Sequence, residues 1–90
     1  RGFIRCRELH SRNYRSMVRV AGVVLIRQRP GSAKGVCFIT IEDETGIANI
    51  VVWPHVMERF RRVVMGARLL EVRGRIEQDD DVQRVYHTLG

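Results

Sequence analysis

The sequence predicts an all-β fold, a small closed barrel of five strands with one helix. Three observations predict it: runs of alternating polar and apolar residues, one segment with helical spacing between the third and fourth runs, and glycines inside two of the longer runs. Ninety residues suit one domain, and a hydrophobic share of 44% suits a globular chain with a modest core.

The chain begins with a polar segment and continues into the barrel. Residues 1–15 carry scattered apolar side chains, and we expect a short helix there that packs against the barrel domain, residues 16–88. The first strand is predicted over 17–28, where Gly22 marks a bulge or sharp bend. A Pro-Gly loop follows, and then two strands surround a turn at 44–46.

A helix is predicted after Trp53, where apolar residues recur at steps of one, three and four. Pro54 suits its first turn, because the missing N–H costs nothing there, and Gly66 is expected to end it. The expected apolar face consists of Val56, Met57, Phe60, Val63 and Val64.

Period-two alternation returns over residues 68–78, and after a turn at 79–81 a fifth strand is expected over 82–89. Five short strands leave two exposed edges unless the sheet closes, and bends at Gly22 and Gly74 allow the first and fourth strands to curve enough for that. The helix then covers one open end. The result is the five-stranded Greek-key barrel called the OB-fold, whose second and third strands bind oligonucleotides or oligosaccharides.

Alternation along the second and third strands separates a core side from an outer side. The expected core set is Cys37, Ile39, Ile41, Ala48, Ile50 and Val52. The expected outer set is Phe38, Thr40, Glu42, Ile47, Asn49, Val51 and Trp53. An outward Phe38 can stack on a base while Asn49 hydrogen-bonds base edges, and the alternative is that Phe38 packs beneath the first loop or the N-terminal segment.

The charge favours an anionic partner. Sixteen basic residues, all but one of them arginine, stand against ten acids and give a net charge of +6. Arginine suits bidentate phosphate recognition, although a GC-rich genome enriches arginine equally. Phosphate contacts are predicted for Arg27 and Arg29 beside the hairpin and, as a second set, for Arg73 and Arg75. The arginines of the helix are expected on a solvated face: Arg59, Arg61 and Arg62.

No catalytic site, metal site or cofactor is predicted for this fragment. The acids at 42–44 point in different directions, those at 79–81 suit a solvated turn, and the three histidines lie apart. Cys6 and Cys37 follow no metal spacing, which favours free thiols in a cytosolic protein. No apolar run approaches the ~20 residues that cross a bilayer. A chain that starts with Arg1 is expected to be a fragment.

The motifs RQRPG, FITIEDETGIAN, VVWP, RFRRVV and GARLL fall within residues 18–77. They closely resemble the C-terminal OB-domain of bacterial error-prone DNA polymerases, the damage-inducible second form of the C-family polymerase alpha subunit. Their F-x-x-x-E-D-x-T-G portion also resembles the anticodon-binding OB-domains of class II tRNA synthetases. In those domains an aromatic residue and an amide contact bases, which matches Phe38 and Asn49. The final strand and the N-terminal segment depart from the polymerase pattern.

The resemblance implies a role and a context. This domain would hold single-stranded template DNA for a bacterial, cytoplasmic polymerase that tolerates damaged template. The catalytic acids of that polymerase, and its divalent metal, expected to be magnesium, lie outside these residues. Two alternatives stay open: a module that docks an accessory protein or another domain of its own chain, for which Val51 and Trp53 would suit, and an anticodon-type RNA binder.

Overall fold

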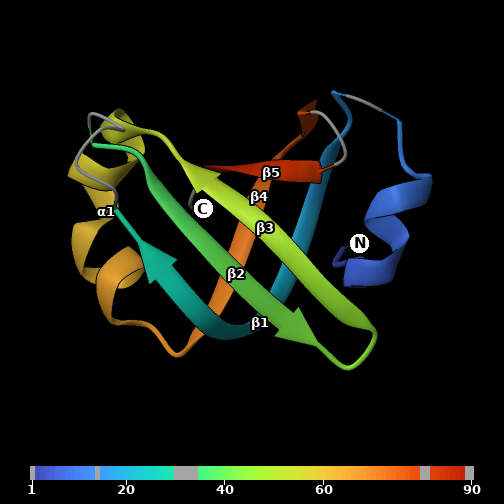
Figure 1. Cartoon of the computed structure of the whole chain (residues 1–90), viewed down its shortest axis with the longest axis horizontal. Coiled ribbons are helices and arrows are strands. Elements are labelled where there is room, and N and C mark those ends of the chain that lie inside the picture. Colours follow the sequence, from blue (N-terminus) through green and yellow to red (C-terminus); the bar gives the residue numbers. More distant parts are fainter. Residues whose placement is uncertain (1, 14, 30–34, 80–81, 89–90) are drawn as a thin grey trace.

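Five strands close into a barrel in the order β1-β2-β3-β5-β4 (Figure 1). The computed structural model describes residues 2–13, 15–29, 35–79 and 82–88. All neighbouring strands are antiparallel except β3 and β5, which are parallel. The predicted five-stranded barrel is therefore confirmed. The strands are β1 (Met17–Gln28), β2 (Cys37–Asp43), β3 (Gly46–Val52), β4 (Leu69–Asp79) and β5 (Val82–Thr88).

Strand β1 belongs to both halves of the barrel. Residues 17–23 pair with β4, whereas residues 23–28 pair with β2. Gly22 lies at this change, and a Cβ there would be 2.5 Å from the carbonyl oxygen of Glu42. Only glycine therefore lets β1 approach β2 so closely. Gly74, the other predicted bend, is buried in β4 and pairs with β1 and β5 in unbroken register.

The core lies inside the barrel. The six residues predicted as the core side of the hairpin are all at most 2% exposed, which confirms the alternation argument. They form one cluster with inward residues of β1 and β4, among them Val18, Val20, Leu70, Val72 and Ile76.

Helix α1 (Pro54–Gly66) lies between β3 and β4, with Pro54 in its first turn as predicted. Three residues of the expected apolar face are buried: Val56, Met57 and Val64. Val63, in contrast, is 46% exposed, so its predicted burial is wrong. The backbone at Phe60 is non-helical, with φ −126° and ψ 31°, so the regular helical spacing is interrupted before Val63.

The N-terminal segment contains a 3-10 helix, η1 (Cys6–Ser11). Cys6 and Leu9 are buried in the core cluster. The backbone N–H of Ile4 donates to the carbonyl oxygen of Arg19 at 2.8 Å, which fixes the start of the chain alongside β1.

None of the helices in the described part of the chain is long and apolar enough to cross a membrane. Most of the loop predicted after the first strand, and residues 80–81 of the predicted acidic turn, lie outside the described residues.

Candidate nucleic-acid interface

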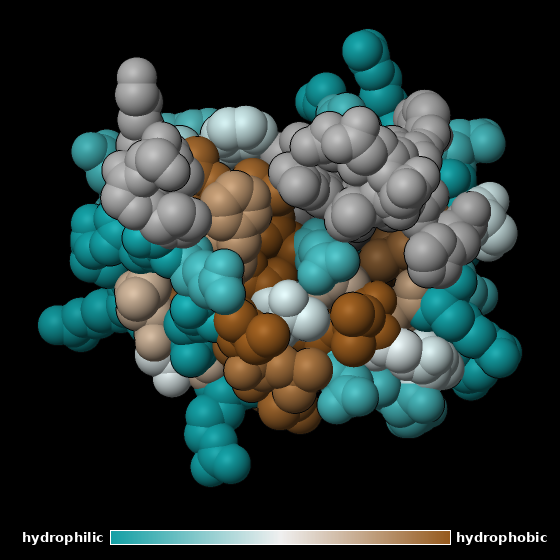
Figure 2. Space-filling view, in the orientation of Figure 1, coloured by the Kyte–Doolittle hydropathy of each residue, from teal (hydrophilic) through white to brown (hydrophobic). Residues whose placement is uncertain are grey.

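A hollow of about 290 Å³ lies on the outer face of the β2–β3 hairpin, beside the end of β1. Figure 2 shows this side of the molecule, with apolar surface gathered at its centre over the front strands of Figure 1. Thr40 lies opposite Asn49 in the register of the two strands, and Phe38 lies opposite Val51. The hollow is lined by Ile26, Gln28, Phe38, Ile39, Thr40, Asn49, Ile50 and Val51.

A side-chain hydrogen bond orients the amide of Asn49. The Thr40 hydroxyl donates to Asn49 Oδ1 at 3.2 Å, and both side chains are half-buried. With Oδ1 occupied in this way, the amide NH₂ group is the part of Asn49 that is left to donate toward a ligand in the hollow. Thr40 therefore acts as the group that positions Asn49.

Phe38 and Val51 belong to the apolar part of the hollow. Phe38 is half-buried and lies outside the core cluster, on the outer side of β2. Val51 is only 2% exposed, so its predicted exposure is wrong. It is flanked by Phe38 on β2 and by the paired strand β5 on its other side. Of the two apolar residues suggested for partner docking, only Trp53 is on the surface, at 40% exposed.

Arg27 does not lie on this outer face. A β-bulge after Val24 shifts the register, so that Arg27 pairs with the inward residue Ile39. Its Nε donates to the carbonyl oxygen of Val64 at 2.8 Å, and its Nη2 donates to the carbonyl oxygen of Ala67. A guanidinium group at this position satisfies the last carbonyls of α1 and complements the helix dipole. The structure therefore gives Arg27 a helix-capping role, and its phosphate contact stays a prediction.

The other predicted arginines are not among the lining residues of the hollow. Arg29 is exposed just beyond the end of β1. Arg73 and Arg75 are exposed on β4, where their register partners on β1 are Arg19 and Met17. The structure thus brings together the predicted aromatic, hydroxyl and amide groups, and none of the predicted arginines is in the described lining of that hollow.

The lining of the β2–β3 hollow contains no charged side chain among the described residues. An apolar ring beside an oriented amide suits a flat, uncharged group with hydrogen-bonding edges, such as a nucleic-acid base. Sequence reasoning missed Ile26 and Gln28, the contributions of β1 to this hollow. Their outward direction depends on the bulge, which has no signal of its own in the sequence beyond the nearby Gly22.

The acidic turn is a hydrogen-bonded connection to the N-terminal segment. Asp43 Oδ1 accepts hydrogen bonds from the Thr45 N–H, the Thr45 hydroxyl and the Gly46 N–H, and Asp43 Oδ2 accepts one from the Cys6 N–H at 2.8 Å. Burial raises the pKa of this carboxyl, but the donors outweigh it and hold the pKa well below its ordinary value. These contacts explain the E-D-x-T-G motif as a structural one.

The surroundings of this turn also affect Cys6. Burial, followed by the charge of Asp43, raises the pKa of the Cys6 thiol to about 11. Within the described residues, no three or more His, Cys, Asp or Glu side chains are grouped to hold a metal ion.

The closed barrel, the helix between β3 and β4 and the hollow on β2–β3 together define an oligonucleotide-binding type of fold. A family model described as OB-fold nucleic acid binding domain matches residues 18–88. The chain belongs to this family.

Its curated relatives include error-prone DNA polymerases. The chain is 64% identical over 86 residues to the error-prone DNA polymerase of Bradyrhizobium sp. (strain ORS 278), covering 96% of this chain and 7% of the relative. It is 55% identical over 85 residues to error-prone DNA polymerase 1 of Rhizobium meliloti (strain 1021), covering 94% of this chain and 8% of the relative. The resemblance found in the sequence is confirmed, and the chain corresponds to a small part of the length of these relatives.

Solved structures agree on the fold. Asparaginyl-tRNA synthetase from Pyrococcus horikoshii is similar with a TM-score of 0.80 and 26% identity, covering 97% of this chain and 22% of that one. The OBody AM1L10, solved bound to hen egg-white lysozyme, has a TM-score of 0.75 at 14% identity, covering 99% and 90% of the two chains. The second likeness supports the fold alone.

Proposed function

We propose that this domain binds single-stranded DNA as part of an error-prone, translesion-type DNA polymerase, with the β2–β3 hollow as its base-binding surface. The observation that carries the proposal is the uncharged hollow in which Phe38 lies beside the oriented Asn49–Thr40 pair. The name of the relatives, error-prone DNA polymerase, supplies the DNA context.

The geometry favours an unpaired strand. A base can place its flat face on Phe38 only after it has left a stack, and bases in a duplex cover each other's faces. Every base offers such a face, so stacking gives affinity with little sequence preference. The NH₂ group of Asn49 can then donate to an acceptor on the base edge. In this proposal the domain holds the template, while the magnesium-dependent chemistry of the polymerase belongs to residues outside this chain.

The test is a titration of a labelled oligothymidylate with the wild-type chain and with Phe38→Ala. We expect the variant to bind more weakly by about 1–3 kcal/mol, because one stacking interaction is lost. Ile47→Ala is the matched control, since Ile47 is 50% exposed on the same hairpin and does not line the hollow. We expect this control to bind like the wild type.

A thermal melt of Phe38→Ala makes the result interpretable. Loss of a core phenylalanine costs about 3–5 kcal/mol of stability, whereas loss of an outer one should leave the chain folded. A folded Phe38→Ala variant with unchanged affinity would contradict the proposed site.

RNA is the second candidate ligand, because the likeness to asparaginyl-tRNA synthetase reaches a TM-score of 0.80. Matched DNA and RNA strands of the same sequence separate the two, since only RNA carries the 2′-hydroxyl. We expect DNA to bind at least as tightly as RNA. A tenfold or greater preference for RNA would replace the proposed ligand.

A further inference from the structure

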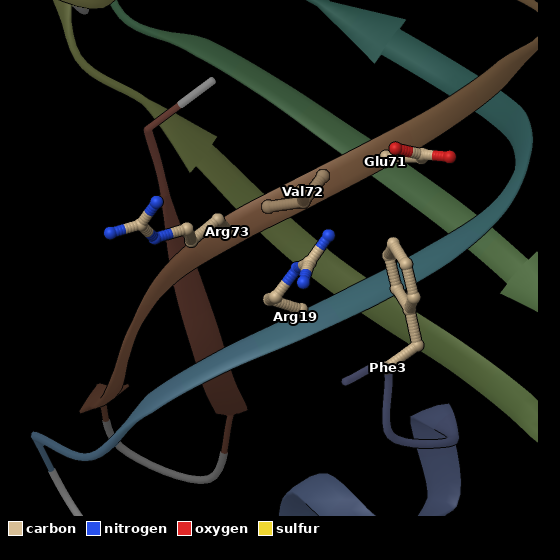
Figure 3. A pocket seen from close by; sticks show the side chains of 5 residues that line it. All are labelled: Phe3, Arg19, Glu71, Val72 and Arg73. Carbon is tan, nitrogen blue, oxygen red and sulfur yellow. The ribbon is translucent and has the colours of Figure 1, made fainter. Parts of the chain in front are cut away.

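A second hollow, of about 410 Å³, lies on the outer face of β1 and β4 (Figure 3). Its lining combines one aromatic ring with charged groups: Phe3, Arg19, Glu71, Val72 and Arg73. A neighbouring hollow of about 380 Å³ shares Arg19 and Arg73 and adds Arg12. Across both hollows, three arginines face one carboxylate.

The groups of this face are held in place before any ligand arrives. The Ile4 N–H donates to the carbonyl oxygen of Arg19, which keeps the neighbouring Phe3 beside β1. The guanidinium carbon of Arg19 lies 4.5 Å from the centroid of the Phe3 ring, a cation–π distance. Figure 3 shows that Phe3 comes from the N-terminal segment, Arg19 from β1 and Arg73 from β4. A binding group that is already ordered loses less entropy when a ligand arrives.

The concentration of basic side chains on this face favours an anion. Arg19 and Arg73 are direct register partners on antiparallel strands, so both belong to the outer face of β1 and β4. The planar guanidinium group also matches the geometry of phosphate oxygens. Arg75, exposed two residues further along the same side of β4, extends the basic surface.

We infer that the β1–β4 face is a second site, which binds the phosphate groups of a nucleic-acid strand. The β2–β3 hollow has no charged side chain in its described lining, so any arginines that neutralise the backbone lie outside that lining. Ile26 lies seven positions after Arg19 on β1, which is at most roughly 23 Å at about 3.3 Å per residue. This inference rests on the proposed function for its ligand, and it concerns a different face and a different part of that ligand.

The test compares two double variants with the same net charge. Arg19→Gln/Arg73→Gln removes the opposed pair, and Arg61→Gln/Arg62→Gln removes two exposed arginines of α1. In oligothymidylate titrations over a range of salt, we expect the first variant to lose tenfold or more in affinity at low salt. Its slope of log K against log salt should become shallower by about 1.4, since each phosphate contact with a single strand contributes about 0.7. The control should keep the wild-type slope.

A charge-preserving variant controls for loss of affinity that is caused by misfolding. Arg19→Lys/Arg73→Lys keeps both charges, so it should retain the salt slope, and melting curves should show that all variants are folded. Equal losses in the two glutamine variants, or an unchanged slope in Arg19→Gln/Arg73→Gln, would overturn the inference.

Inorganic triphosphate separates a strand from free phosphate. Amide chemical shifts of β1 and β4 should move on addition of oligothymidylate and move less with triphosphate at the same concentration. Shifts with triphosphate that equal or exceed those with oligothymidylate would overturn the assignment to a strand. The two proposals fail separately: a Phe38→Ala variant with normal affinity removes the base site, and a glutamine pair with a normal slope removes the phosphate site.

Discussion

The two hollows of this barrel differ in chemistry although they share strand β1. The hollow on β2–β3 is lined by apolar and neutral polar side chains, whereas the described lining of the hollow on β1–β4 contains two arginines and a glutamate beside a phenylalanine and a valine. One suits the flat face of a base and the other suits phosphate. The difference indicates that a small barrel can place base recognition and charge neutralisation on different strand pairs.

The division depends on how β1 turns from one partner to the other. Its first half carries Arg19 beside β4, and its second half carries Ile26 and Gln28 beside β2. Gly22 lies at the change of partner. Substitutions in this strand and in the segments that fix it therefore test whether the two hollows act separately.

The largest effect is expected at Gly22. In Gly22→Ala the new methyl group would meet the backbone of Glu42 at 2.5 Å, and backbone cannot rotate away as a side chain can. We expect a loss of about 3 kcal/mol in the free energy of unfolding and weaker binding at both hollows. Gly66→Ala is the control, because a Cβ there has no described atom within 4 Å. Urea unfolding measures both, and equal stability of the two variants would contradict the close approach of β1 and β2.

The next effect is expected at Asp43, which fastens the N-terminal segment that carries Phe3. Asp43→Asn should cost about 2 kcal/mol at pH 7, because hydrogen bonds to a charged acceptor are lost. Glu44→Gln in the same turn, at an exposed position, should cost little. If Glu44→Gln lost as much stability as Asp43→Asn, the negative charge of the turn, and not the hydrogen bonds of Asp43, would be what stabilises it.

The same residue predicts a pH dependence. The pKa of Asp43 is lowered in the folded chain, so its contribution is complete above the unfolded value of about 4 and is lost as the pH falls below it. The stability difference between the wild type and Asp43→Asn should therefore narrow from pH 7 to pH 3. Urea unfolding at the two pH values measures this, and a constant difference would contradict the lowered pKa.

A smaller effect is expected at Arg27, which separates helix capping from phosphate binding. Arg27→Gln should lower stability by about 1.5 kcal/mol, because two bonds to the last carbonyls of α1 are lost, and it should leave the salt dependence of DNA binding unchanged. Arg29→Gln, at the exposed position beyond the strand, should leave stability unchanged. A flatter salt dependence in Arg27→Gln would show that Arg27 contacts the phosphates of the bound DNA.

Local patterns predicted much of the fold. Alternation in β2 and β3 assigned the core side correctly, and helical spacing with Pro54 located α1. These features depend on residues close together in the sequence, so local sequence patterns are enough to predict them. The closed barrel then follows from the need to pair strand edges.

The features that the sequence did not predict depend on tertiary contacts. The bulge that turns Arg27 toward α1 is set by pairing with β2, and the burial of Val51 is set by its neighbours on β2 and β5. The hollow that joins Phe3 to Arg19 and Arg73 combines segments far apart in the chain. The local periodicity of the sequence does not predict contacts between such distant segments.

The central claim is that the two hollows contribute separate terms to the binding of one strand. The most direct measurement is the affinity of Phe38→Ala for oligothymidylate across a series of salt concentrations. Stacking involves no counterion release. The binding free energy should therefore weaken by about 1–3 kcal/mol at every salt concentration, and the line of log K against log salt should stay parallel to that of the wild type. A line that moves down and also flattens would show that Phe38 and the phosphate contacts form a single site, which contradicts the account.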